Sequence, residues 1–178
     1  DKDMGLFGNL FGGKSKQEPA NAGKSVVCKP KTVYSPLEGT VIPLSEVEDP
    51  AFSQGLMGEG VGIRPSEGKL YAPVDGTVAA VFPTGHAVGL QTDDGMEILL
   101  HIGIDTVEMQ GKGFRSVAKQ GAKVKAGDLL VEFDCGAIEA AGYKTTTMVL
   151  VSNAAAVGTM SSPKLGEASV LDELFSFS

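Results

Sequence analysis

The chain has 178 residues, of which 42% are hydrophobic and 21% are charged, and this length suits one domain with a real hydrophobic core. The formal net charge of −7 excludes a nucleic-acid-binding surface, because no dense stripe of Lys and Arg is available to displace phosphate counterions. No apolar run approaches the roughly 18–20 residues that a membrane-spanning helix needs.

Residues 1–30 differ in composition from the rest of the chain. The stretch GLFGNLFGG (residues 5–13) would place four apolar side chains on one face of a short helix, and two lysines follow. One interpretation is an interfacial anchor that makes weak contact with a membrane surface through residues 4–16. The other interpretation is a flexible N-terminal segment, since this glycine content weakens a helix. The residues after it have the composition of a linker.

Short strand candidates follow, separated by Gly, Pro and Asp. They are Val33–Tyr34, Gly39–Pro43, Val61–Arg64, Gly76–Phe82, His86–Thr92, Met96–Ile102, Lys123–Val124, Leu129–Phe133 and Thr146–Ser152. Phe114–Lys119 and Ala137–Ala141 are expected to form a few short helical turns. The pattern predicts an all-β protein, either a sandwich or a partly open barrel.

One turn-strand motif occurs twice. YSPLEGTVIPL (residues 34–44) and YAPVDGTVAAV (residues 71–81) share a Tyr, a Pro, an acidic residue and Gly-Thr-Val at the same spacing. The duplication predicts a fold with two similar halves.

The only two histidines, His86 and His101, lie on the two arms of one predicted hairpin. A two-residue loop at Asp94-Gly95 would place His101 opposite Val88, with His86 as its diagonal neighbour. A loop at Asp93-Asp94 would place the two histidines directly opposite each other. Either register puts both imidazoles on one face, whereas a three-residue loop would put them on opposite faces.

The face predicted for the histidines also carries Val88, Leu90 and Leu99. Because the other face is the better core candidate, we expect the histidines in an apolar patch that faces outward, which is typical of a docking surface.

Three kinds of site use paired imidazoles. A zinc site needs a third and usually a fourth ligand, for which Asp49 or Asp105 is available. A hydrolytic site needs a Ser or Cys nucleophile beside the histidine; the hairpin has no Ser, and neither Cys28 nor Cys135 has a nearby His. The third kind is phosphoryl transfer, in which one imidazole attacks phosphorus and the other donates a hydrogen bond to the phosphoryl oxygens. The hairpin supplies what this third chemistry needs.

The stretch GMEILLHIGIDTV (residues 95–107) resembles the phosphorylation-site signature of the glucose-type enzyme IIA components of the bacterial phosphoenolpyruvate:sugar phosphotransferase system. APVDGTV (residues 72–78) and GKGF (residues 111–114) resemble that family as well. The resemblance implies an antiparallel β-sandwich with a shallow apolar depression at the site. It places the IIA domain at residues 31–168 and leaves residues 169–178 as a tail.

The resemblance also implies roles for individual residues. His101 would be phosphorylated on Nε2, and His86 beside it would stabilise the phosphoryl group. Thr84 would complete the hydrogen-bond network, and the Gly103 backbone would orient His101.

Further matches concern the surroundings of the histidines. Asp49 and Asp105 match acidic positions whose charge would help the phosphoryl group to leave. The expected docking patch is lined by Phe52, Leu56, Met57, Phe82, Val88, Leu99 and Val107.

The implied function is a phosphohistidine carrier, without metal or nucleotide cofactor, that accepts a phosphoryl group from HPr and passes it to a IIB cysteine of a sugar permease. The same expectation includes regulatory protein partners. It also includes a location in the cytoplasm, with a peripheral position at the inner face of the membrane as one option. Two cysteines form no disulfide framework, which also indicates a reducing compartment. The alternatives are a zinc peptidase or a non-catalytic binding module on a related duplicated β-fold.

Overall fold

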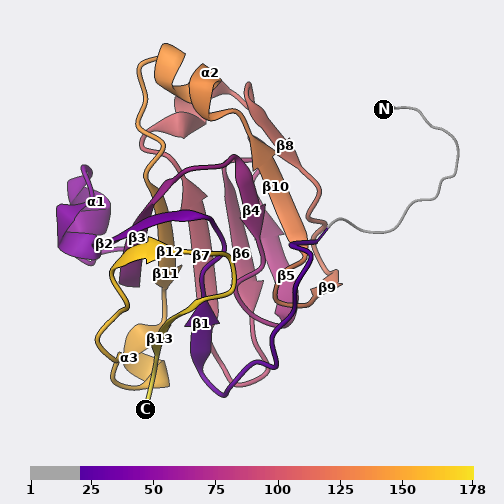
Figure 1. The fold of residues 1–178 in the computed structure, drawn as a ribbon, viewed down its shortest axis with the longest axis vertical. Helices are drawn as coiled ribbons and strands as arrows, with labels where there is room; N and C mark the ends of the chain where they lie inside the picture. Colours follow the sequence, from indigo (N-terminus) through magenta and orange to yellow (C-terminus); the bar gives the residue numbers. More distant parts are fainter. Residues whose placement is uncertain (1–20) are drawn as a thin grey trace, which may run out of the picture.

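The computed structural model describes residues 21–178, and antiparallel strands dominate them (Figure 1). The strands are β1 (Thr32–Tyr34), β2 (Gly39–Pro43), β3 (Glu59–Pro65), β4 (Lys69–Tyr71), β5 (Gly76–Val81), β6 (Ala87–Gln91), β7 (Glu97–Ile102), β8 (Phe114–Ser116), β9 (Lys123–Val124), β10 (Leu129–Phe133), β11 (Thr147–Val151), β12 (Gly166–Ala168) and β13 (Glu173–Ser176). The helical segments are short: η1 (Leu44–Glu46), α1 (Pro50–Ser53), η2 (Thr106–Met109), α2 (Cys135–Ala140) and α3 (Ala154–Val157). None of the helices in this part of the chain is both long and apolar enough to span a bilayer.

An eight-stranded sheet in the order β12-β2-β3-β11-β7-β6-β5-β9 forms one layer. A three-stranded sheet, β4-β10-β8, and the pair β1-β13 complete the antiparallel structure. The two end strands of the large sheet, β12 and β9, do not pair with each other within residues 21–178. The prediction of an all-β sandwich is therefore confirmed, and the fold is not a closed barrel.

The duplicated motif occupies equivalent places in the fold. Its two copies run from β1 into β2 and from β4 into β5, and β2 and β5 each lie second from an end of the large sheet. The copies also contact each other reciprocally, because the Tyr34 amide donates to the Pro73 carbonyl at 3.0 Å and the Tyr71 amide donates to the Pro36 carbonyl at 2.9 Å. The two copies of the motif therefore take reciprocal places in the fold, as the duplication predicts.

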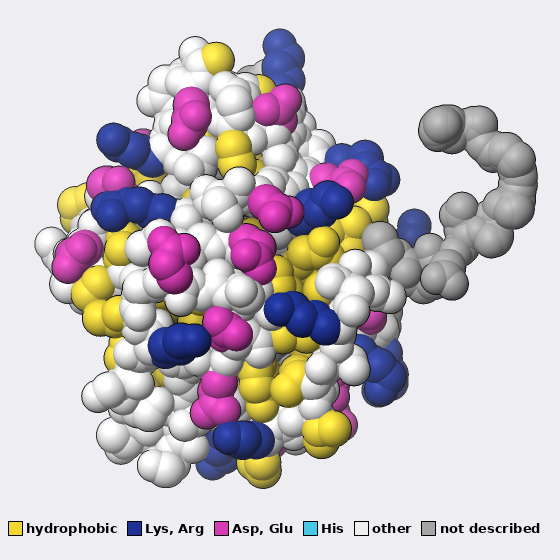
Figure 2. All heavy atoms as spheres, in the orientation of Figure 1, with side chains coloured by type: hydrophobic (Ala, Val, Ile, Leu, Met, Phe, Trp, Pro, Cys, Tyr) yellow, Lys and Arg dark blue, Asp and Glu magenta, His cyan; other side chains and the backbone are white. Residues whose placement is uncertain are grey.

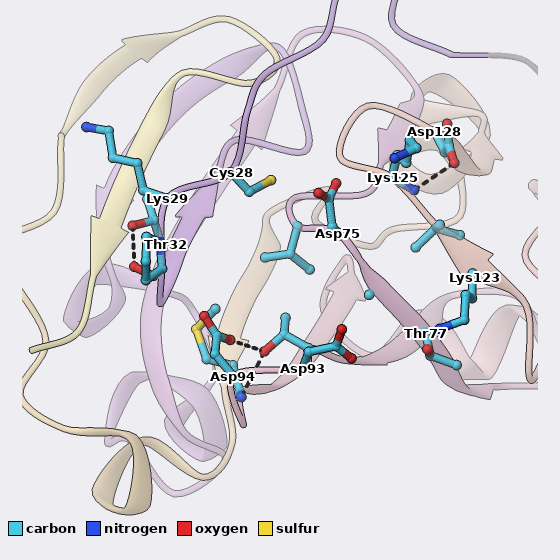
Figure 3. Close-up of a pocket in the computed structure, with 16 residues that line it drawn as sticks. Cys28, Lys29, Thr32, Asp75, Thr77, Asp93, Asp94, Lys123, Lys125 and Asp128 are labelled. Atoms are coloured by element: carbon cyan, nitrogen blue, oxygen red, sulfur yellow. Dashed lines mark hydrogen bonds between the residues drawn. The ribbon is translucent and has the colours of Figure 1, made fainter.

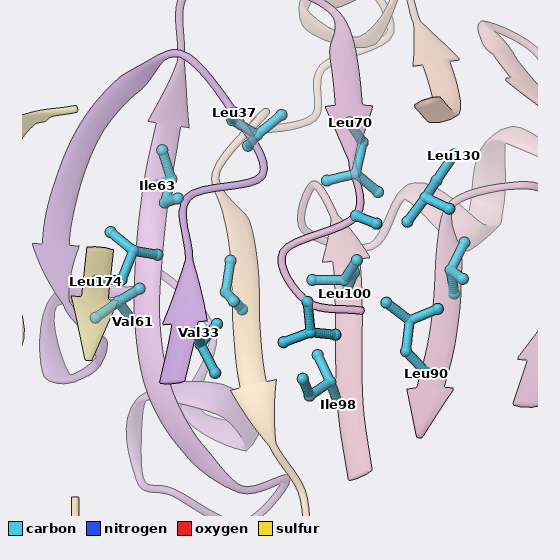
Figure 4. Packing of buried hydrophobic residues seen from close by; sticks show 14 of the residues in the cluster. Val33, Leu37, Val61, Ile63, Leu70, Leu90, Ile98, Leu100, Leu130 and Leu174 are labelled. Atoms are coloured by element: carbon cyan, nitrogen blue, oxygen red, sulfur yellow. The ribbon is translucent and has the colours of Figure 1, made fainter. Parts of the chain in front are cut away.

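The main core fills the space between the large sheet and the smaller ones (Figure 4). Leu100 on β7, Ile63 on β3 and Leu130 on β10 are fully buried in it. Side chains alternate along a strand, so every second residue of the large sheet points away from the main core, to the other face of the sheet. There a second, smaller apolar cluster lies under η1 and α1, formed by Ile42, Val47, Phe52, Ile104, Met148 and Leu150.

Three local expectations are wrong. Residues 169–178 are not a tail, because β13 pairs with β1 and carries Leu174 and Phe175 into the core. Residues 21–30 lie against the domain instead of forming a free linker, and the Ala22 amide donates to the Gly127 carbonyl at 2.9 Å. Phe114–Ser116 forms β8, paired with β10, where helical turns were expected. The anchor expected at residues 4–16 lies outside the described residues.

Truncating Leu174 should test the contribution of β13 to stability. Leu174 is 2% exposed, so we expect Leu174→Ala to lower the free energy of unfolding by about 2–5 kcal/mol, through lost burial and the cavity it leaves. Urea denaturation measures this change. The neighbouring variant Glu173→Ala removes only an exposed ion pair with Lys29 and should cost less than about 1 kcal/mol. Equal, small losses for both variants would contradict a role of β13 in the core.

Candidate functional site

The hairpin that carries the two histidines has a three-residue loop. Ala87 lies opposite His101 in the ladder between β6 and β7, and the Thr92 amide donates to the Met96 carbonyl at 3.0 Å. Asp93, Asp94 and Gly95 therefore form the loop, and both predicted two-residue loops are wrong. Asp94 explains the difference, because its carboxylate accepts hydrogen bonds from Thr92 and from the Lys31 amide of a distant segment.

The corrected register changes the composition of the two faces. Val88 and Leu90 are buried in the main core, so the expectation that Val88 lines a docking patch is wrong. Ala87 and Gly89 take their place on the His101 side of the sheet, beside Leu99, which lies there as predicted. This side packs against the smaller apolar cluster and not against the main core. His101 therefore lies half-buried on the face away from the main core, whereas the expectation that His86 faces outward is wrong, because it is 4% exposed.

The two imidazoles nevertheless meet, because His86 lies one residue before β6 and outside the regular pleat. The chain enters β6 from Gly85, whose φ of +74° favours glycine. The Ile102 amide still donates to the His86 carbonyl at 2.8 Å. The ring centroids of His86 and His101 are 4.9 Å apart, with an interplanar angle of 80°. The irregular turn, rather than the strand period, brings the pair together.

His101 has its ring orientation fixed by the backbone. Its Nδ1 lies 2.9 Å from the Gly103 carbonyl oxygen. A carbonyl oxygen can only accept a hydrogen bond, so Nδ1 carries the proton and Nε2 of the neutral ring keeps a free lone pair. Gly103 adopts φ +81°, a conformation that favours glycine. The arrangement presents Nε2 of His101 as a nucleophile.

His86 is held by a side chain. Its Nδ1 shares a hydrogen bond with the Thr84 hydroxyl, and His86 is only 4% exposed. When the hydroxyl donates, Nδ1 accepts and the proton of the neutral imidazole resides on Nε2. His86 can then offer an N–H donor next to His101.

Apolar contact and burial determine the protonation of the pair. The ring centroids of Phe52 and His101 are 4.9 Å apart. Phe52 is part of α1, whose N-terminus is capped by the Asp49 carboxylate, which accepts a hydrogen bond from the Ala51 amide at 2.9 Å. Burial lowers the pKa of His101 to about 4, and the neighbouring His86 acts in the same direction. Burial also lowers the pKa of His86. Both rings are therefore neutral at pH 7.

Acidic residues flank the pair as expected. The carboxylates of Asp49 and Asp105 act to raise the pKa of His101, against the larger effect of burial. They are thus close enough for their charge to act on a group bound at His101. Asp105 directly precedes η2 with a φ of +59°.

The sequence of this site matches a known family. Residues 31–157 match the profile of the phosphoenolpyruvate-dependent sugar phosphotransferase system EIIA 1 family. The chain belongs to this family. A glucose-specific EIIA component of Halalkalibacterium halodurans is 43% identical over 150 residues, which cover 83% of each protein. The predicted resemblance to glucose-type EIIA proteins is confirmed.

Other relatives are much longer than this EIIA chain. A beta-glucoside-specific EIIBCA component of H. halodurans is 56% identical over 121 residues, which cover 68% of this chain but 19% of that protein. The chain thus spans about a fifth of the fused relatives that it matches. The solved structure of glucose permease IIA from Mycoplasma capricolum superposes with a TM-score of 0.74 at 39% identity, over 81% of this chain and 93% of that one.

The expected docking residues of the EIIA chain divide by exposure. Leu56, Met57, Phe82 and Val107 are 41–74% exposed. Phe82 packs against the site, since its ring centroid lies 5.6 Å from that of His86. Phe52 is buried against the His101 ring and Leu99 is half-buried against the smaller apolar cluster, so these two do not form an open surface.

A cavity lies away from the histidines. It has a volume of about 740 Å³ and is lined at the hairpin tip by Asp93 and Asp94, and elsewhere by Cys28, Asp75 and Lys125 (Figure 3). On the molecular face drawn in Figure 2, acidic and basic side chains are interspersed and no histidine is visible. Within residues 21–178, no three His, Cys, Asp or Glu side chains gather as metal ligands.

Sequence analysis missed one residue next to the site, Thr106. It is fully buried and its hydroxyl donates to the Ile102 carbonyl. The threonine is part of the family signature, and this was the signal available. Its partner depends on how the chain turns after β7, which the signature does not reveal.

The low pKa of His101 predicts a pH-dependent stability. Between pH 6.5 and about 4, the unfolded chain binds a proton at His101 that the folded chain does not bind. The free energy of unfolding should therefore decrease as the pH is lowered through this window. His101 should account for about 2 kcal/mol of this decrease between pH 7 and pH 5. Urea unfolding of the wild type and of His101→Gln at both pH values isolates the effect, because the carboxylates contribute equally. An identical pH dependence in both proteins would contradict this prediction.

Proposed function

We propose that this EIIA chain carries a phosphoryl group on Nε2 of His101, taken from the phosphohistidine of HPr and passed to a cysteine of a IIB domain. The observation that supports the acceptor assignment is the contact between His101 Nδ1 and the Gly103 carbonyl. It leaves Nε2 unprotonated at neutral pH, on a ring that lies next to a second imidazole and the Phe52 phenyl group.

The first transfer is an in-line displacement at phosphorus. The lone pair of His101 Nε2 forms the new N–P bond while the N–P bond of the donor breaks, and its electron pair returns to the donor nitrogen. In the second transfer a cysteine thiolate of the acceptor forms an S–P bond, and His101 recovers its lone pair. His86 donates from Nε2 to the phosphoryl oxygens, and Thr84 holds the His86 ring for this task.

The acidic neighbours favour release. Asp49 and Asp105 place negative charge near a bound phosphoryl dianion, which lowers the free energy gained by its binding. The same charge fits partners with basic surfaces. In this proposal the exposed side chains of Leu56, Met57, Phe82 and Val107 supply the apolar contact with partners, and Phe82 lies against His86.

The names of the relatives support the acceptor partner. The fused relatives are EIIBCA and EIICBA components, so in them an EIIA segment belongs to the same chain as the B component. We infer that a IIB domain is the acceptor here too and that the chain acts in sugar uptake in the cytoplasm. Contact of residues 4–16 with a membrane surface and binding of regulatory proteins remain proposals of the same kind. The scheme needs neither a metal nor a nucleotide cofactor.

Reconstituted phosphotransfer tests the proposal. The full chain is incubated with phosphoenolpyruvate, enzyme I and HPr, and its modified residue is mapped by mass spectrometry under alkaline conditions. We expect one acid-labile phosphoryl group per chain on His101, which a IIB domain removes. A phosphoryl group on another residue, or no transfer from HPr at any concentration, would refute the proposed role.

A further inference from the structure

We propose that Thr106 is a positioning residue that keeps Nε2 of His101 unprotonated, because it fixes the turn whose Gly103 carbonyl accepts from His101 Nδ1. The inference rests on the proposed function, in which His101 is the phosphoryl acceptor. Thr106 itself has no role in contact with the phosphoryl group.

The hydroxyl of Thr106 completes the strand ladder where the chain departs from it. In an antiparallel ladder, a hydrogen-bonded pair exchanges two backbone bonds. The Ile102 amide donates to the His86 carbonyl, so a regular ladder would return a bond from the His86 amide to the Ile102 carbonyl. That carbonyl instead accepts the Thr106 hydroxyl. Thr106 thus ties the end of β7 in place at the point where His86 leaves the pleat.

The methyl group of Thr106 fixes the other side of the same turn. A Cβ on Gly103 would lie 2.3 Å from Cγ2 of Thr106 and 2.9 Å from the Lys144 carbonyl oxygen. The methyl group therefore packs into the space that glycine leaves free. The Gly103 amide donates to the Thr146 carbonyl at 3.0 Å and the Ile104 amide donates to the Lys144 carbonyl at 3.1 Å, so the segment before β11 holds the peptides on both sides of Gly103.

The bond from the Thr106 hydroxyl and the backbone bonds to Lys144 and Thr146 together determine where the Gly103 carbonyl points, while the methyl group fills the space beside them. Gly103 is flexible in the unfolded chain and gains its orientation from these neighbours. Loss of the Thr106 hydroxyl leaves the buried Ile102 carbonyl without its partner, which costs free energy. We expect the local backbone to shift until this carbonyl finds another donor. A shifted Gly103 carbonyl no longer selects the Nδ1–H tautomer of His101. A ring protonated on Nε2 cannot attack phosphorus.

The test compares four variants of the full chain. Thr106→Val keeps the shape of the side chain and removes the hydroxyl, Thr106→Ser keeps the hydroxyl, and Thr106→Ala removes both groups. The matched control is Thr32→Val on β1. Thr32 is likewise buried, at 3% exposed, and its hydroxyl likewise donates to a backbone carbonyl, that of Pro30, at 2.9 Å. The imidazole ¹⁵N shifts at pH 7 report the tautomer in the unphosphorylated protein, and HPr-dependent labelling reports the rate.

We expect the wild type, Thr106→Ser and Thr32→Val to show His101 protonated on Nδ1 alone. Thr106→Val and Thr106→Ala should show Nε2–H signal and accept the phosphoryl group about ten to a hundred times more slowly. Should Thr106→Val fail to fold, the Ser and Ala variants decide, because both lack the methyl group and only Ser keeps the hydroxyl.

A wild type with His101 protonated on Nε2 would overturn the inference, whatever the variants do. So would a slow Val or Ala variant with an unchanged tautomer, because its defect would then be purely structural. Failure of the proposed function is a separate result: His101→Gln would still accept the phosphoryl group, while the tautomer measurement on the unphosphorylated protein would be unaffected.

Discussion

Replacing His101 by glutamine should abolish phosphoryl acceptance altogether. Nε2 of His101 is the nucleophile of the proposed transfer, and its lone pair is free because Nδ1 donates to the Gly103 carbonyl. A glutamine amide nitrogen has its lone pair delocalised into the carbonyl group and forms no phosphoramidate under these conditions. We therefore expect no label above background when His101→Gln is incubated with phosphoenolpyruvate, enzyme I and HPr.

The chain offers a matched control for this experiment, since His86 is its only other histidine. His86→Gln should still be labelled in the same assay. Near-wild-type circular dichroism and a cooperative urea transition establish that each variant is folded. Labelling of His101→Gln to the wild-type level would end the assignment of His101 as acceptor, and equal loss in both variants would leave its special role unsupported.

The strands were predictable where local chemistry determines them. β2, β9 and β10 begin and end at the predicted residues, because Gly, Pro and Asp interrupt short β-branched or apolar runs there. β13 was not predicted, because two acidic residues precede its apolar residues in the sequence. Phe175 and Phe177 become buried only when β1, which lies more than a hundred residues earlier, supplies a partner.

The site shows the same division between local and distant causes. The hairpin pattern identified the histidine pair, and the resemblance to the EIIA family predicted the Gly103 backbone contact and the flanking carboxylates. The hairpin register was wrong because the loop is set by the bond from the Lys31 amide to Asp94, a contact between residues 63 positions apart. The meeting of the two rings then depends on the turn at Gly85, which no strand period describes.

Replacing His86 by glutamine should separate acceptance from donation. In acceptance the nucleophile is the neutral His101 ring, and the donor phosphohistidine is already activated, so we expect a rate within about threefold of the wild type. In donation an anionic thiolate must approach a dianionic phosphoryl group. His86 reduces this repulsion, because it donates to the phosphoryl oxygens and can take up a proton beside the dianion.

Glutamine cannot gain that positive charge, and it lacks the imidazole whose ring centroid lies 4.9 Å from that of His101. Transfer from phosphorylated His86→Gln to a IIB cysteine should therefore slow by about 10²- to 10³-fold. Single-turnover transfer from the isolated phosphoprotein measures this step alone. Thr84→Val keeps the imidazole but removes its hydroxyl partner, so its donation rate should be intermediate. Unchanged donation by His86→Gln, or an equal fall in both steps, would show that His86 does not act on the transferred group in the proposed way.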